Sequence, residues 1–343
     1  MTSALKNKIW GSLAGLAVGD AMGMPFHELT PDEIKRRCGG IATTFHPIFE
    51  DEFIHLDYKA GQVTDDTTLS IVTAKAISKY QGKITIDQFV QELADWVRNN
   101  QSIWQHGNVY GPSTKGAFNN LLNNKFDFYL DRTRTWCTSG TSNGAVMRVS
   151  PAGWANPGNI EKSVELACTV ILPTHPTDIA LSAASGQAAA VAAALTENAT
   201  VNSIIEAMLK GVKLGEEIGK KTARIIDQRY PLPCLEVALE LAEKAKDPFE
   251  AGDLIRRFLG SHLHASEALA TAAGIFYAAK GDPESSIIAA INNGGDTDTI
   301  GSIAGALVGA LHGIESIPNT WVSTVEEVNK LHFETLAAEM SSL

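Results

Sequence analysis

Cysteine is scarce in this chain: its 343 residues include only four, and no two of them form a Cys-x-x-Cys pair. The four are Cys38, Cys137, Cys168 and Cys234. Such scattered cysteines exclude a zinc knuckle and a disulfide framework. Residues 1–10 also lack the basic-then-apolar pattern of a secretion signal. We therefore expect a cytoplasmic protein whose thiols are reduced.

Long apolar runs and an excess of basic charge are also missing. The uncharged stretch at 300–311 is too short to cross a bilayer. The longer stretch at 179–195 carries Ser182, Ser185 and Gln187, which favours a buried Ala-rich helix. The net charge of -11 argues against nucleic acid or an anionic membrane as the main partner.

The alternating pattern of β-strands is nearly absent, and no Gly-x-Ser-x-Gly motif supports a serine nucleophile. Apolar residues recur instead at helical spacing. This predicts helices near 5–22, 66–81, 86–99, 113–123, 160–171, 176–195, 201–222, 235–245, 248–258, 264–280, 283–291, 297–312 and 320–338. No hinge composition interrupts them, so we expect one compact all-α domain over residues 1–343. A long loop at 40–63 is a candidate functional segment.

Two of the expected helices carry glycine at every fourth position. The rows are Gly11, Gly15, Gly19 and Gly23, and Gly301, Gly305, Gly309 and Gly313. A helical glycine costs about 1 kcal/mol relative to alanine, so close backbone packing is the expected compensation. If the two helices pack antiparallel, Asp20 comes close to Asp296 and Asp298. Packing of each row against some other helix remains open.

Two short acidic clusters stand where helices are expected to begin. They are Thr64-Asp65-Asp66-Thr67 and Gly294-Gly295-Asp296-Thr297-Asp298-Thr299. Each alone is explained by helix capping, because Thr and Asp cap helices and acids suit a first turn. Together they predict a two-metal site, since carboxylate and hydroxyl oxygens are hard ligands that suit Mg²⁺, Mn²⁺ or Ca²⁺. Paired glycines before the second cluster suggest a close backbone approach.

Two loops are candidates for binding a phosphate or a ribose. The first, from Gly140 to Arg148, offers free backbone N–H groups, and Arg148 is a partner for either a phosphate or a buried carboxylate. The second enters a helix at Gly111 and Ser113, where an ordinary helix start is an equal alternative. His175 is a candidate for ligand contact or for capping. His262 and His264 lack a nearby third ligand, so we interpret them as part of a solvated loop.

At these residues the sequence resembles the ADP-ribosylglycohydrolase family. The matching pieces are GSLAGLAVGDAMG at 11–23, TDDT at 64–67, SNGAVMRVSP at 142–151, THP at 174–176 and GGDTDTIGSIAGALVGALHG at 294–313. They follow the family's order along almost the whole chain. The resemblance implies an all-α orthogonal multi-helix bundle with two Mg²⁺ or Mn²⁺ ions.

The resemblance also implies roles for individual residues. Those that match metal ligands are Thr64, Asp65, Asp66, Asp296, Asp298 and Thr299. Those expected at the substrate are Ser142, Asn143, Gly144, Met147, Arg148, His175, Gly111 and Ser113. Glu28 and Asp66 are the candidate catalytic groups. The family usually places an acid seven positions after the residue matching Asp20. Here that position is His27, and Glu28 follows it.

The implied activity is hydrolysis of the glycosidic bond at the anomeric carbon of an ADP-ribosyl group. Fixed ribose hydroxyls, polarised water and negative charge near the developing oxocarbenium ion suit this chemistry. The expected partner is an ADP-ribosylated protein or a small ADP-ribosyl substrate. Two alternatives remain: hydrolysis of a small nucleoside or ADP-ribose derivative, and a non-catalytic relative that binds ADP-ribose.

Overall fold

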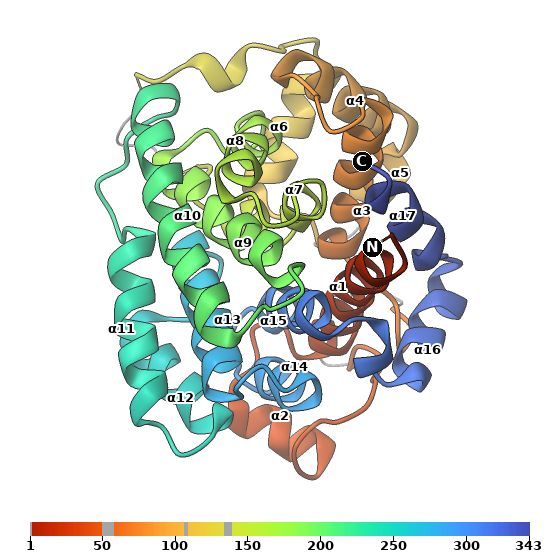
Figure 1. The fold of residues 1–343 in the computed structure, drawn as a ribbon, viewed down its shortest axis with the longest axis vertical. Helices are drawn as coiled ribbons and strands as arrows, with labels where there is room; N and C mark the ends of the chain where they lie inside the picture. The colour runs from red at the N-terminus through yellow and green to blue at the C-terminus, as the bar shows by residue number, and fades with distance from the viewer. Residues whose placement is uncertain (1, 50–57, 106–108, 134–138) are drawn as a thin grey trace.

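A computed structural model describes residues 2–49, 58–105, 109–133 and 139–343. These residues form seventeen α-helices with short 3₁₀ turns, and no β-strand occurs among them (Figure 1). The first nine helices are α1 (Thr2–Gly23), α2 (Pro31–Cys38), α3 (Asp65–Lys79), α4 (Ile86–Asn99), α5 (Gln101–Gln105), α6 (Pro112–Leu122), α7 (Ser150–Trp154), α8 (Ile160–Ile171) and α9 (Asp178–Ala194). The others are α10 (Val201–Thr222), α11 (Pro231–Lys244), α12 (Pro248–Leu259), α13 (Ala265–Ala278), α14 (Pro283–Ile291), α15 (Thr297–His312), α16 (Asn319–Asn329) and α17 (Phe333–Ser341). The all-α prediction is confirmed.

Most helices begin where the sequence places a cap. Thr85 and Thr200 form capping boxes at the starts of α4 and α10, and Asp247 caps α12. Three helices were not predicted: the charged α2 and the very short α5 and α7. The signal for α2 was present, because Thr30 and Glu33 form a capping box around Pro31.

The prediction of one helix over 320–338 was wrong. The structure divides this segment into α16 and α17. Lys330 takes a left-handed conformation with φ 54°, and this ends α16 before α17 begins at Phe333. Of the predicted loop at 40–63, residues 50–57 lie outside the described part of the chain.

Helices α1 and α15 pack against each other along their glycine rows (Figure 1). Gly15 faces Gly305, Gly19 faces Gly301, and the two directions are antiparallel. A Cβ atom added at Gly15 or Gly305 would come within 3.0 Å of the other helix's backbone. The predicted pairing is therefore confirmed, and it brings the end of α1 to the start of α15.

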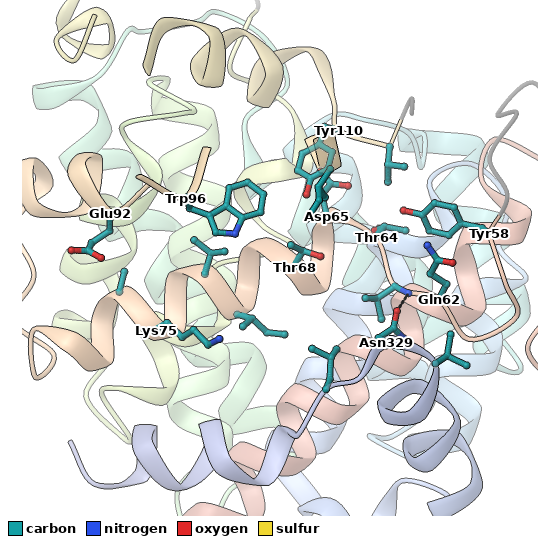
Figure 2. Close-up of a pocket in the computed structure, with 18 of the residues that line it drawn as sticks. Tyr58, Gln62, Thr64, Asp65, Thr68, Lys75, Glu92, Trp96, Tyr110 and Asn329 are labelled. Atoms are coloured by element: carbon teal, nitrogen blue, oxygen red, sulfur yellow. Dashed lines mark hydrogen bonds between the residues drawn. The ribbon is translucent and has the colours of Figure 1, made fainter. Parts of the chain in front are cut away.

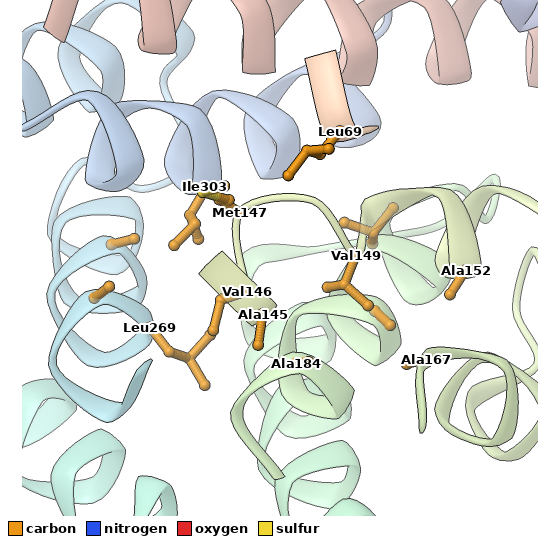
Figure 3. Close-up of a cluster of buried hydrophobic side chains, with 14 of the residues drawn as sticks. Leu69, Ala145, Val146, Met147, Val149, Ala152, Ala167, Ala184, Leu269 and Ile303 are labelled. Carbon is orange, nitrogen blue, oxygen red and sulfur yellow. The ribbon is translucent and has the colours of Figure 1, made fainter. Parts of the chain in front are cut away.

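One buried hydrophobic cluster draws on residues from Ile9 to Met340, and α17 packs on α1. Figure 3 shows how the segment 145–149 contributes to it: Val146 and Met147 lie among side chains of the surrounding helices, such as Leu269 of α13 and Ile303 of α15. This packing anchors a site loop in the core. The single domain over 1–343 stays a prediction, with which the shared core agrees. Among the described helices, none is both long and apolar enough to span a membrane.

Candidate metal centre

The two acidic clusters meet in the fold. Thr64 caps α3, so Asp65 and Asp66 occupy its first turn. Asp296 occupies the N-cap position of α15 without a capping hydrogen bond from its side chain, and Asp298 lies in the first turn. Asp20, near the end of α1, joins them. All five carboxylates are buried, with relative exposure between 0% and 5%. Buried acids so close together are costly unless something compensates their charge.

The paired glycines before α15 explain how the second cluster reaches this place. Gly294 and Gly295 both have φ near 80° (79° and 77°), a region that favours glycine. The N–H of Gly295 donates to the carbonyl of Leu29, and the N–H of Asp296 donates to that of Ser261. A side chain at either glycine would meet neighbouring backbone. The close approach expected from the sequence is thus present, between 294–295 and residues 29–31 and 261.

Asp20 has a positioning role within the acidic cluster. Its carboxylate accepts hydrogen bonds from the N–H groups of Thr64 and Thr67, at 3.0–3.1 Å, and from the Thr67 hydroxyl. It therefore binds the N-terminus of α3 to α1. This contact holds Asp65 and Asp66 in register with α15.

Asp298 is shared by two groups of potential ligand atoms. Asp298, Asp296 and His27 form one group, and Asp298, Asp66 and Asp20 form the other. Within each group the ligand atoms lie within 4.8 Å of one another. Nδ1 of His27 lies 2.9 Å from Oδ1 of Asp298 and 3.1 Å from Oδ1 of Asp296. A shared carboxylate between two such groups is the arrangement of a two-ion site.

Neighbouring side chains orient these carboxylates. The Ser302 hydroxyl donates to Oδ1 of Asp66 at 2.6 Å, and the Asn143 amide donates to Oδ2 of Asp296. Oδ1 of Asp296 is buried and accepts no hydrogen bond from the described residues, despite its distance of 3.1 Å from Nδ1 of His27. One oxygen of the Asp296 carboxylate is thus held by the protein, and the other is available to a metal ion, as is usual for carboxylate ligands.

The electrostatics show how strongly this cluster requires positive charge. Burial and then the neighbouring carboxylates raise the pKa of Asp65 and of Asp66 well above the usual value. Burial likewise raises the pKa of Asp298 to about 7. Burial opposes a charge on His27, but Asp298 and Asp296 outweigh it and raise the pKa of His27 well above normal. His27 in turn overcomes the effect of burial and holds the pKa of Asp296 below its usual range.

These residues fit a divalent cation. Five buried carboxylates supply hard oxygen ligands, and repulsion between them is relieved by a positive ion. The hydroxyls of Thr64 and Thr299 lie in the same two first turns. Thr64 also contacts Asp66, to which its hydroxyl donates at 3.3 Å, and the Thr299 hydroxyl lies 4.0 Å from the sulfur of Met147. Five of the six predicted metal ligands, Asp65, Asp66, Asp296, Asp298 and Thr299, line one cleft, and Thr64 lines the groove that adjoins it. Their role as ligands stays a prediction.

The first candidate binding loop, residues 140–148, borders the cleft that contains the acids; we call it the ribose loop. Residues 143–145 form a 3₁₀ turn whose entry is fixed by the Asn143 N–H, which donates to the carbonyl of Leu263 at 2.8 Å. Ser142, Asn143, Gly144 and Met147 all line the cleft that contains the acids. Four of the predicted substrate contacts are thus placed at the cleft.

Arg148 and His175 lie behind that loop. The Arg148 guanidinium is buried and donates to the carbonyls of Gly144 and Val170 and to the Thr174 hydroxyl. His175 is fully buried, and its Nε2 lies 2.9 Å from the Ser142 hydroxyl. Burial and the charge of Arg148 lower the pKa of His175 to about 3, so its imidazole is neutral. These contacts give both residues a role in shaping the loop, and direct ligand contact stays a prediction for each.

The second candidate binding loop, which contains Gly111 and Ser113, has one residue at the cleft and one behind it. Gly111 lines the cleft, whereas the Ser113 hydroxyl accepts a hydrogen bond from the N–H of Gly140 at 3.0 Å. Ser113 therefore ties this loop to the ribose loop. The histidine pair was interpreted as solvated, and this holds for His262, which is exposed. His264 is less exposed and caps α13, with Nδ1 accepting from the N–H of Ser266.

His27 and Glu28 point to different neighbours. His27 faces the acids, while Oε2 of the exposed Glu28 lies 3.0 Å from Nδ1 of His262. The reason is local: Glu28 is left-handed with φ 61°, and its N–H donates to the carbonyl of Gly295 at 2.7 Å. From the sequence, Glu28 rather than His27 was the predicted site residue, although both follow Asp20 at the end of the same helix. The spacing from Asp20 was the available signal.

Two hollows meet at Asp65 and Tyr110. The cleft that holds the acids has a volume of about 350 Å³, and a groove of about 790 Å³ adjoins it. Figure 2 shows the groove, with Asp65 beside Tyr110, Lys75 farther along α3 and Trp96 on α4. Burial and then Asp65 raise the pKa of Tyr110, so its phenol stays protonated. Thr64 lines the groove rather than the cleft.

Fold and site together define an all-α protein with a buried carboxylate centre suited to divalent cations. The family model of ADP-ribosylglycohydrolase matches residues 1–343. The chain therefore belongs to the ADP-ribosylglycohydrolase family.

Individual relatives agree with this membership. The chain is 29% identical over 335 residues to the uncharacterized protein YegU of Escherichia coli K12, covering 97% of this chain and 96% of that protein. It is 25% identical to the ADP-ribosyl-[dinitrogen reductase] glycohydrolase of Rhodospirillum rubrum, over 94% of this chain and 92% of that enzyme. A solved structure titled as an ADP-ribosylglycohydrolase-related protein complex superposes with a TM-score of 0.69 at 22% identity, covering 99% of both chains. That structure supports the fold alone.

Proposed function

We propose that this protein is a divalent-metal-dependent hydrolase that cleaves the bond between the anomeric carbon of an ADP-ribosyl group and its acceptor. The observation that carries the proposal is the meeting of two helix N-termini, which place four buried carboxylates at the wall of one cleft, while a fifth, that of Asp20, is hydrogen-bonded to the start of α3. Family membership supplies the substrate class, and the Rhodospirillum rubrum relative is named for this chemistry. We retain the cytoplasm as the proposed compartment.

The residues proposed to hold two Mg²⁺ or Mn²⁺ ions are Thr64, Asp65, Asp66, Asp296, Asp298 and Thr299. When bound, such ions neutralise the carboxylates, bind sugar hydroxyls and lower the pKa of bound water. Asp66 is held by Ser302 and lies in the first turn of α3, so its carboxylate is fixed in direction. A fixed carboxylate loses little entropy on binding and stabilises positive charge that develops nearby.

The chain's own groups account for the remaining steps. Ser142, Asn143 and Gly144 line the cleft, and their role in this proposal is to position the ribose. The bond from the anomeric carbon to the acceptor breaks as a water oxygen bonds to that carbon from the other side. One proton of the water passes to a carboxylate, for which Glu28 and Asp66 are our candidates, while the other stays on the new hydroxyl. The acceptor leaves with the proton that the carboxylate has taken up, so the carboxylate is regenerated.

The two hollows match the two halves of such a substrate. A glycoside extends in both directions from its anomeric carbon, and the cleft and groove both end at Asp65. We assign the cleft, which is lined by Ser142, Asn143 and Gly144, to the ribose whose anomeric carbon reacts. The larger groove, walled by Trp96 and Tyr110, is assigned to the group on the other side of the bond.

The activity test is hydrolysis of a substrate panel by the full chain. ADP-ribosyl-arginine peptide, ADP-ribosyl-serine peptide, O-acetyl-ADP-ribose and simple nucleosides are each incubated with Mg²⁺, Mn²⁺ or EDTA. We expect release of ADP-ribose from at least one ADP-ribosyl substrate, and complete loss of release in EDTA. Liquid chromatography of the products measures it.

The alternative functions have distinct results in the same panel. Turnover of nucleosides alone would replace the proposal by a small-molecule hydrolase. Binding of ADP-ribose by calorimetry without turnover of any substrate would identify a non-catalytic binding protein. Equal turnover with and without EDTA would refute the metal-dependent mechanism.

The proposed role of Glu28 has its own test. Glu28→Gln keeps the shape of the side chain and removes its basic oxygen. We expect kcat to fall by about 10²-fold or more, the usual contribution of a general base, while the Kd for ADP-ribose changes little. Single-turnover hydrolysis and calorimetry measure the two quantities.

The matched control is Asp32→Asn, which removes an exposed acid from neighbouring α2. His262→Ala is a second control, because it frees the Glu28 carboxylate from its partner in the structure. We expect both controls to retain activity. A Glu28→Gln variant with kcat within twofold of the original would remove Glu28 as the base and leave Asp66.

A further inference from the structure

We infer that His27 is a ligand of one ion in the proposed metal pair, so that this position binds a divalent transition metal such as Mn²⁺ or Co²⁺ in preference to Mg²⁺. The inference rests on the proposed metal site and specifies its chemistry.

The geometry supports a ligand role for the imidazole. Nδ1 of His27 is 2.9 Å and 3.1 Å from carboxylate oxygens of Asp298 and Asp296, which converge on it from the N-terminus of α15. These three ligand atoms lie within 4.8 Å of one another. Oδ1 of Asp296, one of them, is buried without a hydrogen bond from any described residue. One nitrogen and two oxygens thus surround a single point.

The backbone holds His27 in this orientation. His27 directly follows the 3₁₀ turn 24–26, and its N–H donates to the carbonyl of Met24 at 3.2 Å. The left-handed Glu28 then turns its own side chain toward His262. His27 itself is only partly exposed, with 20% of its side-chain surface accessible. Its place at the acids is therefore built into the turn that ends α1.

The second group of ligand atoms differs in chemistry. Asp20, Asp66 and Asp298 offer oxygen only. Mg²⁺ prefers such all-oxygen surroundings, whereas an imidazole nitrogen favours transition metals, whose affinities rise along the series from Mn²⁺ to Cu²⁺. Because Asp298 belongs to both groups, the two positions are adjacent but unequal. We therefore expect the all-oxygen position to discriminate little between Mg²⁺ and Mn²⁺, and the position beside His27 to bind Mn²⁺ more tightly than Mg²⁺.

A competing interpretation makes His27 an internal cation. A protonated imidazole at this place forms an ion pair with Asp296 and Asp298 and substitutes for a metal charge. In that case an ion near His27 has no nitrogen ligand, and an acid at position 27 strengthens metal binding without changing its selectivity. The two interpretations thus differ in nitrogen coordination and in selectivity.

The experiment compares the original chain with His27→Glu, which restores an oxygen ligand, and His27→Gln, which serves if the first variant does not fold. Equilibrium dialysis with elemental analysis measures the number of bound ions and the Mn²⁺ and Mg²⁺ affinities. Electron spin-echo spectroscopy of the Mn²⁺-loaded protein detects a directly bound ¹⁴N nucleus. We expect a nitrogen signal in the original chain and its loss in both variants. We also expect the Mn²⁺/Mg²⁺ affinity ratio to fall by about tenfold or more in His27→Glu.

The control is His262→Gln. His262 contacts Glu28 and belongs to neither group of potential ligands, so this variant is expected to retain the nitrogen signal and the Mn²⁺/Mg²⁺ affinity ratio. Two bound ions with no nitrogen signal and an unchanged affinity ratio would overturn the role of His27 and leave the proposed hydrolase intact. Absence of divalent ions from both the original chain and His27→Glu would overturn the metal site and, with it, the proposed function.

Discussion

Asp298→Ala is expected to lose both ions and all measurable hydrolysis. Asp298 is the only described residue that belongs to both groups of potential ligands, so its removal leaves each group incomplete. Metal ions supply several kcal/mol of transition-state stabilisation, and each 1.36 kcal/mol is a factor of ten. We therefore expect a loss of more than about 10³-fold in kcat/KM. Elemental analysis of dialysed protein measures the metal content, and product chromatography measures the activity.

Asp298→Ala is also expected to abolish the stabilisation of the folded protein by Mn²⁺. A ligand present at 100 times its Kd stabilises the folded state by about 2.7 kcal/mol. Addition of Mn²⁺ should therefore raise the Tm of the original protein and leave the Tm of Asp298→Ala unchanged. In EDTA, Asp298→Asn is expected to be at least as stable as the original, because one of five crowded carboxylates has lost its charge.

Asp95→Ala is the matched control, since Asp95 is an exposed acid on α4 whose side chain pairs with Arg98. It should keep the metal content, the activity and the response of Tm to Mn²⁺. Two ions still bound to Asp298→Ala would contradict the shared-carboxylate site. Hydrolysis retained without those ions would contradict the metal-dependent reaction.

The sequence was sufficient for the parts of the site that follow from short-range rules. Helical periodicity located most helices, and the Thr-Asp starts of α3 and α15 placed their acids in first turns. The glycine rows predicted close backbone packing and made an antiparallel pairing of α1 with α15 one of two open possibilities, which the structure decides in its favour. From that pairing the meeting of Asp20 with Asp298 follows directly.

Other features depend on tertiary geometry that composition does not encode. Whether His27 or Glu28 faces the acids is decided by a left-handed residue and one backbone hydrogen bond to Gly295. From the sequence alone, Arg148 could be interpreted either as a phosphate ligand or as a structural hydrogen-bond donor. In the structure its guanidinium donates to carbonyl and hydroxyl groups of the protein. The groove beside Trp96 combines α3, α4 and the C-terminal end of α16, which are far apart in the chain. No local sequence pattern predicts a surface that is formed by such distant segments.

Gly305→Ala is expected to destabilise the fold substantially although alanine is the better helix former. The added methyl group would meet the carbonyl group of Gly15 and the N–H of Leu16, all backbone atoms of α1. No change of rotamer relieves a contact with backbone, so α1 and α15 must move apart. Overpacking of a well-packed core costs about 1–3 kcal/mol and sometimes more. We expect a loss of at least about 2 kcal/mol in the free energy of unfolding, measured by urea denaturation.

The matched control is Gly116→Ala on α6, where an added Cβ meets no atom within 4 Å. There the same substitution should stabilise by up to about 1 kcal/mol, because only helix propensity changes. The opposite signs separate backbone contact from propensity. Because the α1–α15 contact also places Asp20 beside Asp298, Gly305→Ala should weaken Mn²⁺ binding, while Gly116→Ala should not. Equal stability changes in the two variants would show that the glycine rows do not bring these helices together.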